Sequence, residues 1–382
     1  MQEAKIAIIH DYMTAFGGAE RVLKAIHDLF PKAVVFTSSY DPESMPEEFK
    51  TWEIRTTGVD KLPLFSSLSK HYTALYPVYF ENFDLSEFDI IISSSTAWSK
   101  AVITKPHQLH ICYCHTPARF LYKYSGESNK RNTWYYKPFV GFIDNILRTW
   151  DFASAQRPNF IVANSNTVAD RIRKFYRREP DAVIYPPVKT EYDVVLPQEG
   201  AHRIENNYFL MVSRLSAYKN VHLVIEAFNR MKTPLRIVGA GKEIEHLKKI
   251  ARMDIAFLGK VSERELNILY QNSKGLIFPV QDEDFGISPV EAMAHGKPVL
   301  SHKSGGPTEY IEEGKTGMFF DDISVEGIIN AVDKFDAAIT ANTYDSGYIK
   351  QAAKRFDEKV FAENFRKFVE EKWTGYAGAP RS

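Results

Sequence analysis

Short apolar runs alternate along this chain with longer stretches in which apolar residues recur every three or four positions. The first run, residues 5–9, predicts a buried strand, and residues 18–30 predict a helix that Pro31 ends. Further strands are expected at residues 33–37, 89–93, 109–114, 160–163, 208–213, 235–238, 255–258, 275–278 and 298–300. Strands that alternate with amphipathic helices are typical of an α/β fold with doubly wound, Rossmann-like parallel sheets.

The length of 382 residues favours two domains rather than one core. A double proline, Pro186-Pro187, cannot lie inside a central strand and is read as the exit from the first domain. The expected domains are residues 1–188 and 189–355, with the polar stretch 189–207 as the crossing. Residues 356–382 are expected to form a C-terminal helix, at 356–373, and a loose tail.

Composition narrows the class of protein. Hydrophobic residues make up 44% and charged residues 25%, as in soluble globular proteins, and 48 basic residues balance 48 acidic ones. A neutral chain gives no general reason to expect nucleic acid as a partner. No apolar run reaches membrane-spanning length and the N-terminus leads into a strand, so a cytoplasmic location is expected. Cys112 and Cys114 alternate on one predicted strand beside His110, which indicates buried cysteines rather than a metal site.

Residues 275–294 carry the most specific chemistry. A predicted buried strand leads into a glycine loop, and a helix is expected to begin near Ser288-Pro289, because serine before a first-turn proline is a start signal. The helix N-terminus and the amides of Phe285, Gly286 and Ile287 would form an anion site.

Two carboxylates flank this anion site. Glu283 precedes it and Glu291 lies one turn inside the helix, which suits hydroxyls of two sugars on either side of a diphosphate. With the run EDFGISPVEAMA and the following GKPV, the segment resembles the Glu-x7-Glu motif of glycosyltransferase family 4, retaining enzymes with the GT-B fold. The resemblance implies that Glu283 binds the donor sugar and Glu291 the ribose. The alternative is a capped helix with two solvated carboxylates.

A cationic pair follows the first strand of the second domain. Arg214 and Lys219 can both donate to phosphate, Arg as a fork and Lys as a point charge. The resemblance implies that they hold the donor pyrophosphate. The alternative is a pair of solvated loop charges.

In the first domain, Gly17 and Gly18 occupy the first strand-to-helix turn, where backbone amides can approach a ligand. His115 lies in the run CHTPARF after a predicted strand. Mannosyltransferase members of the family carry a similar histidine-threonine-proline run, which implies that His115 contacts the transferred sugar. A structural histidine with satisfied hydrogen bonds is the alternative.

Other motifs are less specific. Asp282 and Asp284 also form an Asp-x-Asp pattern, which in another transferase fold holds a divalent metal. Because Arg214 and Lys219 can neutralise the phosphates, we expect metal-independent transfer with no cofactor. The turn 239–241 begins a dinucleotide fingerprint but lacks the third glycine, so it is expected near the donor nucleotide, with Val261 as a base contact. The turn 304–309 is expected to allow close backbone packing near the phosphate-binding helix.

Residues 119–148 combine basic and aromatic side chains. Six basic residues against two acidic ones give about +4 on a neutral chain, and residues 62–80 add a second aromatic and apolar stretch. Such surfaces suit anionic lipid, whereas a core helix with a solvated face is an equal alternative.

The resemblance covers nearly the whole chain and implies two facing domains, with the last helix crossing back to the first. It predicts a retaining hexosyltransferase, with mannose from GDP-mannose as the expected transfer, acting on a glycan or lipid-linked sugar in cell-surface polysaccharide synthesis. The enzyme would work in the cytoplasm, at the inner face of the membrane if the basic stretch binds lipid. A nucleotide-sugar epimerase or hydrolase and a non-catalytic sugar-nucleotide-binding protein are the alternatives.

Overall fold

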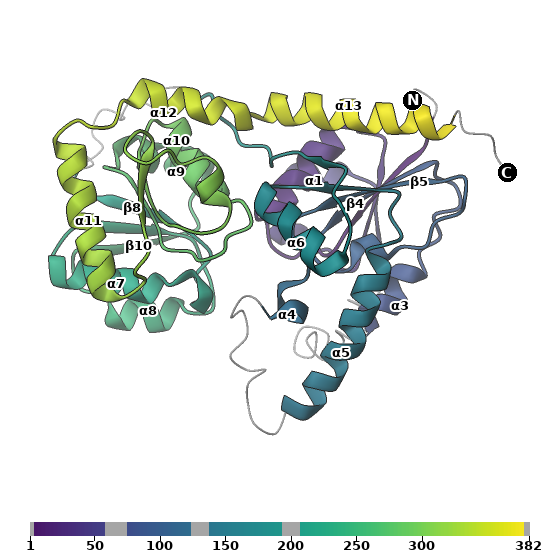
Figure 1. Ribbon diagram of the computed structural model, residues 1–382, viewed down its shortest axis with the longest axis horizontal. Helices are drawn as coiled ribbons and strands as arrows, with labels where there is room; N and C mark the ends of the chain where they lie inside the picture. Colours follow the sequence, from purple (N-terminus) through teal and green to yellow (C-terminus); the bar gives the residue numbers. More distant parts are fainter. Residues whose placement is uncertain (1–3, 58–74, 124–136, 193–206, 378–382) are drawn as a thin grey trace. The chain divides into compact units, whose positions relative to one another are not determined.

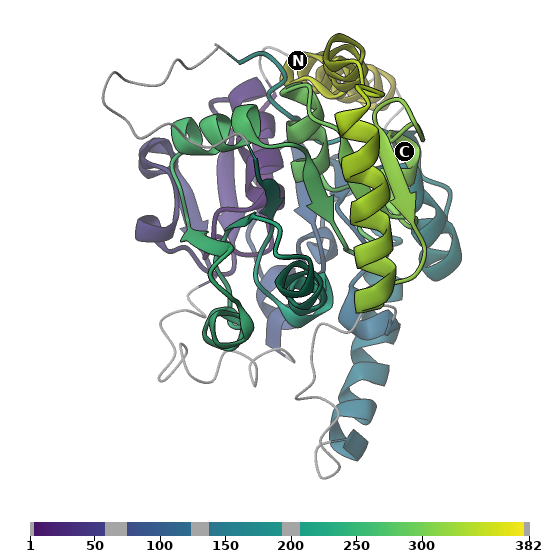
Figure 2. The same cartoon turned by 90° about the vertical axis from the view of Figure 1, so that its left-hand side faces the viewer.

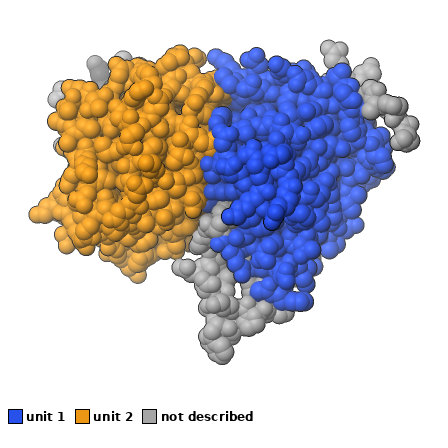
Figure 3. Space-filling model, in the orientation of Figure 1, with its two compact units in different colours: residues 1–124, 128–187, 359–382 blue, residues 125–127, 188–358 orange. Residues whose placement is uncertain are grey.

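The computed structural model describes residues 4–57, 75–123, 137–192 and 207–377. The chain divides into two compact units, shown in different colours in Figure 3. The first unit contains Met1–Tyr124, Ser128–Pro187 and Lys359–Ser382, and nearly all of the second is Val188–Glu358.

The first unit contains a seven-stranded sheet in its described residues. Its strands run parallel in the order β3-β2-β1-β4-β5-β6-β7. The strands are β1 (Ile6–His10), β2 (Val34–Thr37), β3 (Ile54–Thr56), β4 (Ile90–Ser95), β5 (Leu109–Cys114), β6 (Phe160–Ala163) and β7 (Ala182–Val183). The helices are α1 (Gly18–Leu29), α3 (Tyr76–Glu81), α4 (Arg119–Tyr122), α5 (Lys137–Ser154), α6 (Asn166–Tyr176) and α13 (Glu358–Ala377).

Successive side chains of a strand point to opposite faces of this sheet, and each face carries its own hydrophobic core. On β4, Ile90 and Ile92 belong to the cluster packed against α1 and α13, whereas Ile91 belongs to a cluster with α3 and α5. Cys112 and Cys114 on β5 are buried against α6, which confirms the expectation of buried strand cysteines. Because both faces are covered, the strands read as continuous apolar runs.

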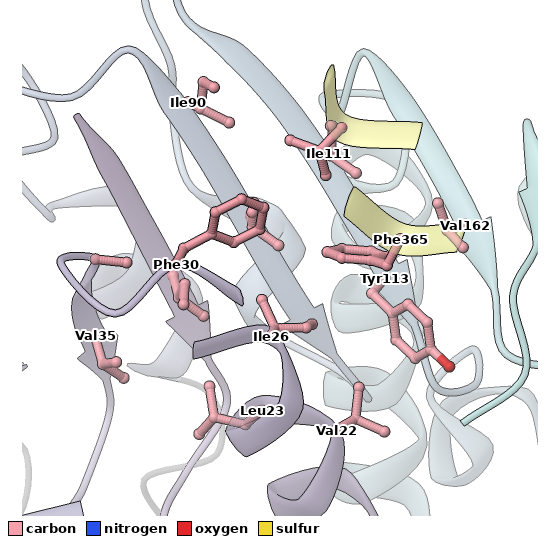
Figure 4. Close-up of a cluster of buried hydrophobic side chains, with 14 of the residues drawn as sticks. Val22, Leu23, Ile26, Phe30, Val35, Ile90, Ile111, Tyr113, Val162 and Phe365 are labelled. Atoms are coloured by element: carbon pink, nitrogen blue, oxygen red, sulfur yellow. The ribbon is translucent and has the colours of Figure 1, made fainter. Parts of the chain in front are cut away.

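The last helix completes the first unit's core. Phe361, Phe365, Phe368 and Val369 of α13 are buried in the cluster that also holds residues of α1 and the sheet. Figure 4 shows Phe365 beside Tyr113 of β5, and their ring centroids lie 5.9 Å apart. The C-terminal helix therefore returns to the N-terminal sheet, as the resemblance implied.

The second unit has the same plan. Its described residues form a six-stranded parallel sheet in the order β10-β9-β8-β11-β12-β13, with helices on both faces (Figures 1 and 2). The strands are β8 (Phe209–Val212), β9 (Leu235–Val238), β10 (Ile255–Gly259), β11 (Leu276–Phe278), β12 (Val299–His302) and β13 (Gly317–Phe320). The helices are α7 (Val221–Met231), α8 (Ile244–Ile250), α9 (Glu263–Asn272), α10 (Ile287–Ala294), α11 (Val325–Thr340) and α12 (Ser346–Ala353).

Each sheet has one position where the strand order reverses. In the first unit the chain builds outward from β1 to β3 and then from β4 to β7, so the reversal lies between β1 and β4. In the second unit it lies between β8 and β11. The loops that leave the carboxyl ends of two such strands diverge, and ligands of open α/β sheets bind there. The fold thus marks one candidate position in each unit.

Candidate active site

A largely buried ion pair occupies the reversal point of the second sheet. Lys219 follows β8 and Glu283 follows β11, and Lys219 Nζ lies 2.5 Å from Glu283 Oε2. Lys219 is only 8% exposed. The side-chain amide of Asn220 donates to the carbonyl oxygen of Pro279 at 3.0 Å and ties the two loops together. Two residues expected separately, one for phosphate and one for sugar, are therefore a single charge-paired unit.

Two glycines fix the backbone beneath Glu283. The amide of Gly306 donates to the carbonyl oxygen of Glu283 at 2.8 Å. A Cβ on Gly305 would lie 2.3 Å from that same oxygen, and one on Gly306 would lie 2.4 Å from Cα of Phe285. Only glycine allows this approach. The expectation of close packing at this turn is confirmed, and its effect is to hold the carboxylate loop in place.

Helix α10 begins earlier than its serine and proline suggested. It spans Ile287–Ala294 with Gly286 as the N-cap, at a φ of 86°, so Pro289 is its third residue and Ser288 does not cap it. The expected start near Ser288-Pro289 is confirmed to within one residue, but the expected signal was wrong, because the left-handed glycine rather than the serine side chain caps the helix.

The hydroxyl of Tyr310 braces the backbone at this helix start. Its oxygen lies 2.8 and 2.9 Å from the carbonyl oxygens of Phe285 and Gly286, which share its single proton. Burial raises the pKa of Tyr310 well above its usual value, with a smaller contribution from the charge of Glu283, so the hydroxyl keeps its proton. Within the described part of the chain, the amides of Gly286 and Ile287 have no hydrogen-bond acceptor. A helix start with such amides attracts an anion.

Arg214 lies on the loop that follows β8, and its side chain is exposed. Two glycines let a neighbouring turn pack directly against the backbone of this loop. A Cβ on Gly239 would lie 1.9 Å from the carbonyl oxygen of Ser213, and one on Gly241 would lie 2.0 Å from that of Leu215. No carboxylate among the described residues forms an ion pair with Arg214. The turn 239–241 therefore supports the arginine loop. Val261, the expected base contact, is half-buried just after β10, two strands away from β8.

Glu291 is buried on α10 and accepts a hydrogen bond from the hydroxyl of Tyr270 on α9 at 2.9 Å. The ring of His295 stacks on Tyr270 and Tyr192, with centroids 5.0 and 4.1 Å apart. Burial lowers the pKa of His295, which favours the neutral ring. Sequence reasoning missed these aromatic neighbours, because nothing in the spacing of Tyr192, Tyr270 and His295 indicates that they meet.

The glycine turn of the first unit is partly occupied by the protein itself. Gly17 caps α1 and Gly18 is its first residue, and both are exposed. The amide of Gly17 donates to Glu20 Oε2 at 2.8 Å. The Gly17 amide therefore already has an acceptor within the protein.

His115 lies at the carboxyl edge of the first sheet and is 7% exposed. Its Nε2 lies 2.8 Å from Ser94 Oγ, and Ser94 Oγ lies 3.1 Å from His10 Nδ1. His10 ends β1, so this group occupies the reversal point of the first sheet. Sequence reasoning found His115 but missed His10 and Ser94. Both are polar residues at the carboxyl end of an otherwise apolar strand, and this pattern could have identified them.

Asp11 fastens the loop that follows β4. Its carboxylate oxygens accept from the backbone amides of Thr96, Ala97, Trp98 and Ser99 at 2.6–2.9 Å, and from the Thr96 hydroxyl. Burial works to raise the pKa of Asp11, but these hydrogen bonds and the charge of His10 outweigh it and leave the pKa lowered. The carboxylate therefore stays ionised and holds β1 and β4 in register around the histidines.

Two family models match the chain. The model described as Glycosyltransferase Family 4 covers residues 16–192, and the model described as Glycosyl transferases group 1 covers residues 196–339. Among solved structures, HepE of Anabaena in complex with UDP is similar, with a TM-score of 0.69 and 18% identity over 96% of this chain and all of that one. The two parallel sheets and this structural likeness define the GT-B fold, and the two family models make the chain a glycosyltransferase.

The chain belongs to glycosyltransferase family 4. Curated relatives extend over almost its whole length. The alpha-1,3/1,6-mannosyltransferase alg2 of Schizosaccharomyces pombe is 27% identical, covering 97% of this chain and 81% of the relative. The O-antigen chain mannosyltransferase C of Escherichia coli is 23% identical, covering 94% and 95%.

Proposed function

We propose that this chain is a mannosyltransferase that moves mannose from GDP-mannose, with retention of configuration, to a glycan or lipid-linked sugar in the synthesis of a cell-surface polysaccharide. Relatives named as mannosyltransferases support the sugar, and the name of one of them, an O-antigen chain mannosyltransferase, supports a glycan acceptor. The observation that carries the proposal is the Lys219–Glu283 pair beside the start of α10. It combines a cation for the leaving phosphate with an acceptor for sugar hydroxyls.

The chemistry needs no enzyme nucleophile. The bond between the sugar C1 and the diphosphate oxygen breaks, a bond from C1 to the acceptor oxygen forms, and the acceptor proton passes to the leaving phosphate. Lys219, Arg214 and the amides of Gly286 and Ile287 stabilise the charge that develops on that phosphate. Lys219 can do this while it holds Glu283, because an ammonium group has three donors.

The remaining predicted residues position the donor. Glu283 accepts from hydroxyls of the transferred sugar, Glu291 from the ribose, and His115 contacts the sugar. Phe285 supports the amide turn, and Gly18 is the exposed glycine that a ligand would meet at the first unit's turn. These roles stay predictions until a donor complex is tested.

We further propose that transfer needs no divalent metal, because Lys219, Arg214 and the N-terminal amides of α10 neutralise the charge of the diphosphate. The test is the initial rate in excess chelator, followed by addition of Mg²⁺ or Mn²⁺. An unchanged rate supports the proposal, and a rate that falls to background and returns with metal refutes it.

The donor is tested by a thermal-shift panel of GDP- and UDP-linked sugars on the purified chain. Selective stabilisation by GDP-mannose, lost in Glu283→Gln but kept in the exposed control Glu263→Gln, supports the proposal. A response to UDP-sugars alone would overturn the donor. Turnover of bound donor that is equally fast without any acceptor would instead indicate a hydrolase or epimerase. Binding without turnover would indicate a non-catalytic nucleotide-sugar-binding protein.

Peripheral attachment to an anionic membrane is part of the proposal. Much of the basic and aromatic stretch, residues 124–136, lies outside the described residues, as do residues 62–74 of the second stretch. The described part of α5 exposes Phe142 and Ile146, at 65% and 54%, on one side of the helix. No helix among the described residues combines the length and apolar character needed to span a bilayer.

Attachment is measured by co-sedimentation with vesicles that contain phosphatidylglycerol. The double variant Phe142→Glu/Ile146→Glu should bind much less, whereas Met253→Glu, at a fully exposed apolar position of the second unit, should bind like the parent chain. Equal binding by all three would refute this part of the proposal.

A further inference from the structure

Tyr310 connects the glycine turn after β12 to the backbone at the start of α10. It follows the short helix η8 (Gly306–Glu309), and its ring packs against those of Phe285 and Phe356, with centroids 5.3 and 5.6 Å apart. The side chain is buried, with an exposed fraction of 2%. Its oxygen lies 2.8 Å from the carbonyl oxygen of Phe285 and 2.9 Å from that of Gly286. One buried hydroxyl thus contacts two successive carbonyl groups at the helix start.

The placement of these two carbonyl groups decides where the next two amides point. In a planar trans peptide the C=O and N–H bonds point in opposite directions. The carbonyl of Phe285 shares its plane with the amide of Gly286, and the carbonyl of Gly286 shares its plane with the amide of Ile287. Because both carbonyls face the Tyr310 hydroxyl, both amides face away from it. These are the two amides of the helix start that have no acceptor among the described residues.

Glycine at position 286 allows the hydroxyl to come this close. Its φ of 86° lies in the left-handed region, which favours glycine. A Cβ on Gly286 would lie 2.9 Å from the Tyr310 hydroxyl oxygen and 3.4 Å from the ring of Phe278. The turn and the hydroxyl are therefore fitted to each other, and a larger residue at this position would push them apart.

The same segment also fixes the other half of the candidate site. The amide of Gly306, the first residue of η8, donates to the carbonyl oxygen of Glu283 at 2.8 Å, and Glu283 pairs with Lys219. Helix η8 and the tyrosine that follows it therefore hold both the carboxylate loop and the amide turn. A phenylalanine ring would fill the same space as Tyr310. What the hydroxyl adds is contact with the two peptide planes that carry the amides of Gly286 and Ile287.

We propose that Tyr310 is a positioning residue that aims the amides of Gly286 and Ile287 at the diphosphate of the donor. This deepens the proposed function and rests on its assignment of this turn to the leaving phosphate. With the hydroxyl in place, both amides already point to one side, so no reorientation is needed as charge develops on the phosphate. Without it, the peptide plane between Phe285 and Gly286 loses one of the contacts that hold its direction.

Pairwise isotope labelling can observe these two amides individually. The sequence contains two Phe-Gly steps, ending at Gly17 and Gly286, and two Gly-Ile steps, ending at Ile287 and Ile328. Chains labelled with ¹³C′-phenylalanine and ¹⁵N-glycine, or with ¹³C′-glycine and ¹⁵N-isoleucine, should therefore give two amide signals each. The amide of Ile328 already donates to a backbone carbonyl at 3.0 Å and serves as an internal reference. Phe16→Leu and Ile328→Val each remove one signal of a pair and so assign it.

Inorganic pyrophosphate, which carries the charge of a leaving diphosphate, is the probe for the full chain. In the parent, the Gly286 and Ile287 signals should move downfield with a common saturation curve while the Ile328 signal stays in place. Tyr310→Phe keeps the ring and should remain folded. Both signals should respond less in this variant, with the dissociation constant for pyrophosphate raised about 3–10-fold.

The titration separates two kinds of failure. If the Gly286 and Ile287 signals of the parent chain do not respond to pyrophosphate, the anion site of the proposed function fails and this inference fails with it. If they respond equally in the parent and in Tyr310→Phe, the anion site stands and only the positioning role of Tyr310 is overturned.

A second buried tyrosine of the same unit offers a matched control. Tyr208 is 1% exposed, and its hydroxyl donates to the carbonyl oxygen of Leu269 at 2.8 Å. Tyr208→Phe should lower the thermal midpoint about as much as Tyr310→Phe does, but leave kcat and the Gly286 and Ile287 signals as in the parent. If the two variants change kcat and these signals equally, the effect is a general loss of stability and the proposal is overturned.

Steady-state kinetics separate positioning from ordinary binding. Because the amides act mainly on charge that develops during transfer, Tyr310→Phe should lower kcat about 10–100-fold and change the KM for the donor by less than about threefold. A kcat equal to that of Tyr208→Phe would overturn the proposal. A raised KM at constant kcat would overturn it as well, because the hydroxyl would then support binding of the donor and not the transition state.

Discussion

Replacing Lys219 by methionine tests the centre of the proposed site. The change keeps a long side chain but removes the charge that lies 2.5 Å from Glu283 Oε2. Transition-state stabilisation of a leaving phosphate by one fixed cation is comparable to that of one oxyanion donor, about 3–4 kcal/mol. We therefore expect kcat to fall about 10²–10³-fold.

Stability should respond as well, because the pair is largely shielded from water. The side chains of Lys219 and Glu283 are 10% and 17% exposed, so Lys219→Met leaves a carboxylate with its partner removed in a poorly solvated position. We expect a loss of about 2–3 kcal/mol in the free energy of unfolding, somewhat below that for a fully buried pair. The double variant Lys219→Met/Glu283→Gln should lose less than Lys219→Met alone, because no uncompensated charge remains.

The assays are initial rates at saturating donor and denaturant unfolding of the ligand-free chain. Lys189 forms a matched but exposed pair with Glu263 at 3.0 Å, with side chains 50% and 69% exposed, so Lys189→Met should alter neither quantity much. If Lys219→Met keeps kcat within about threefold of the parent chain, Lys219 does not stabilise the leaving phosphate and the reasoning is refuted.

Three further predictions concern other parts of the chain. Gly306→Ala should lower kcat/KM about 100-fold, because its Cβ would displace the loop that carries Glu283. Gly375→Ala, with open space around its Cβ, should keep the kcat/KM of the parent chain. Equal kcat/KM values for the two variants would contradict this. Tyr270→Phe removes the hydrogen bond to Glu291 and should raise KM for the donor about 3–10-fold at nearly constant kcat, as steady-state kinetics would show; an unchanged KM would count against a ribose contact. Burial lowers the pKa of His110 to about 3, with smaller contributions from nearby arginines, so between about pH 6.5 and 3 the unfolded chain binds a proton that the folded chain does not. The free energy of unfolding should therefore fall as pH is lowered through this window, by up to about 1.4 kcal/mol per pH unit. Measured at several pH values, this slope should be flatter in His110→Gln. An equally steep slope in that variant would show that other groups cause it.

The alternation of elements was predictable because most strands are buried on both faces. Runs such as residues 90–95 and 109–114 stand out against the amphipathic helices between them. The strands β3, β7 and β13 were missed, because short half-buried strands at the edge of a sheet leave no pattern.

The candidate residues of the second unit were found one by one, but their pairing was not. Lys219 and Glu283 are 64 positions apart, and only the strand order brings β8 beside β11. Glu20 shows the same limit in the first unit. It looks like an ordinary polar residue of an amphipathic helix, yet it is buried and contacts His10 on the strand before it.

The return of α13 to the N-terminal sheet has a consequence for biosynthesis. The sheet leaves the ribosome early, yet Phe361, Phe365, Phe368 and Val369 cover one of its faces. At about 1.5–3 kcal/mol for each buried side chain, that face lacks a large part of its stabilisation until the whole second unit has been translated. Until then this apolar face is partly uncovered, which makes it a surface at which unfinished chains can aggregate or bind chaperones.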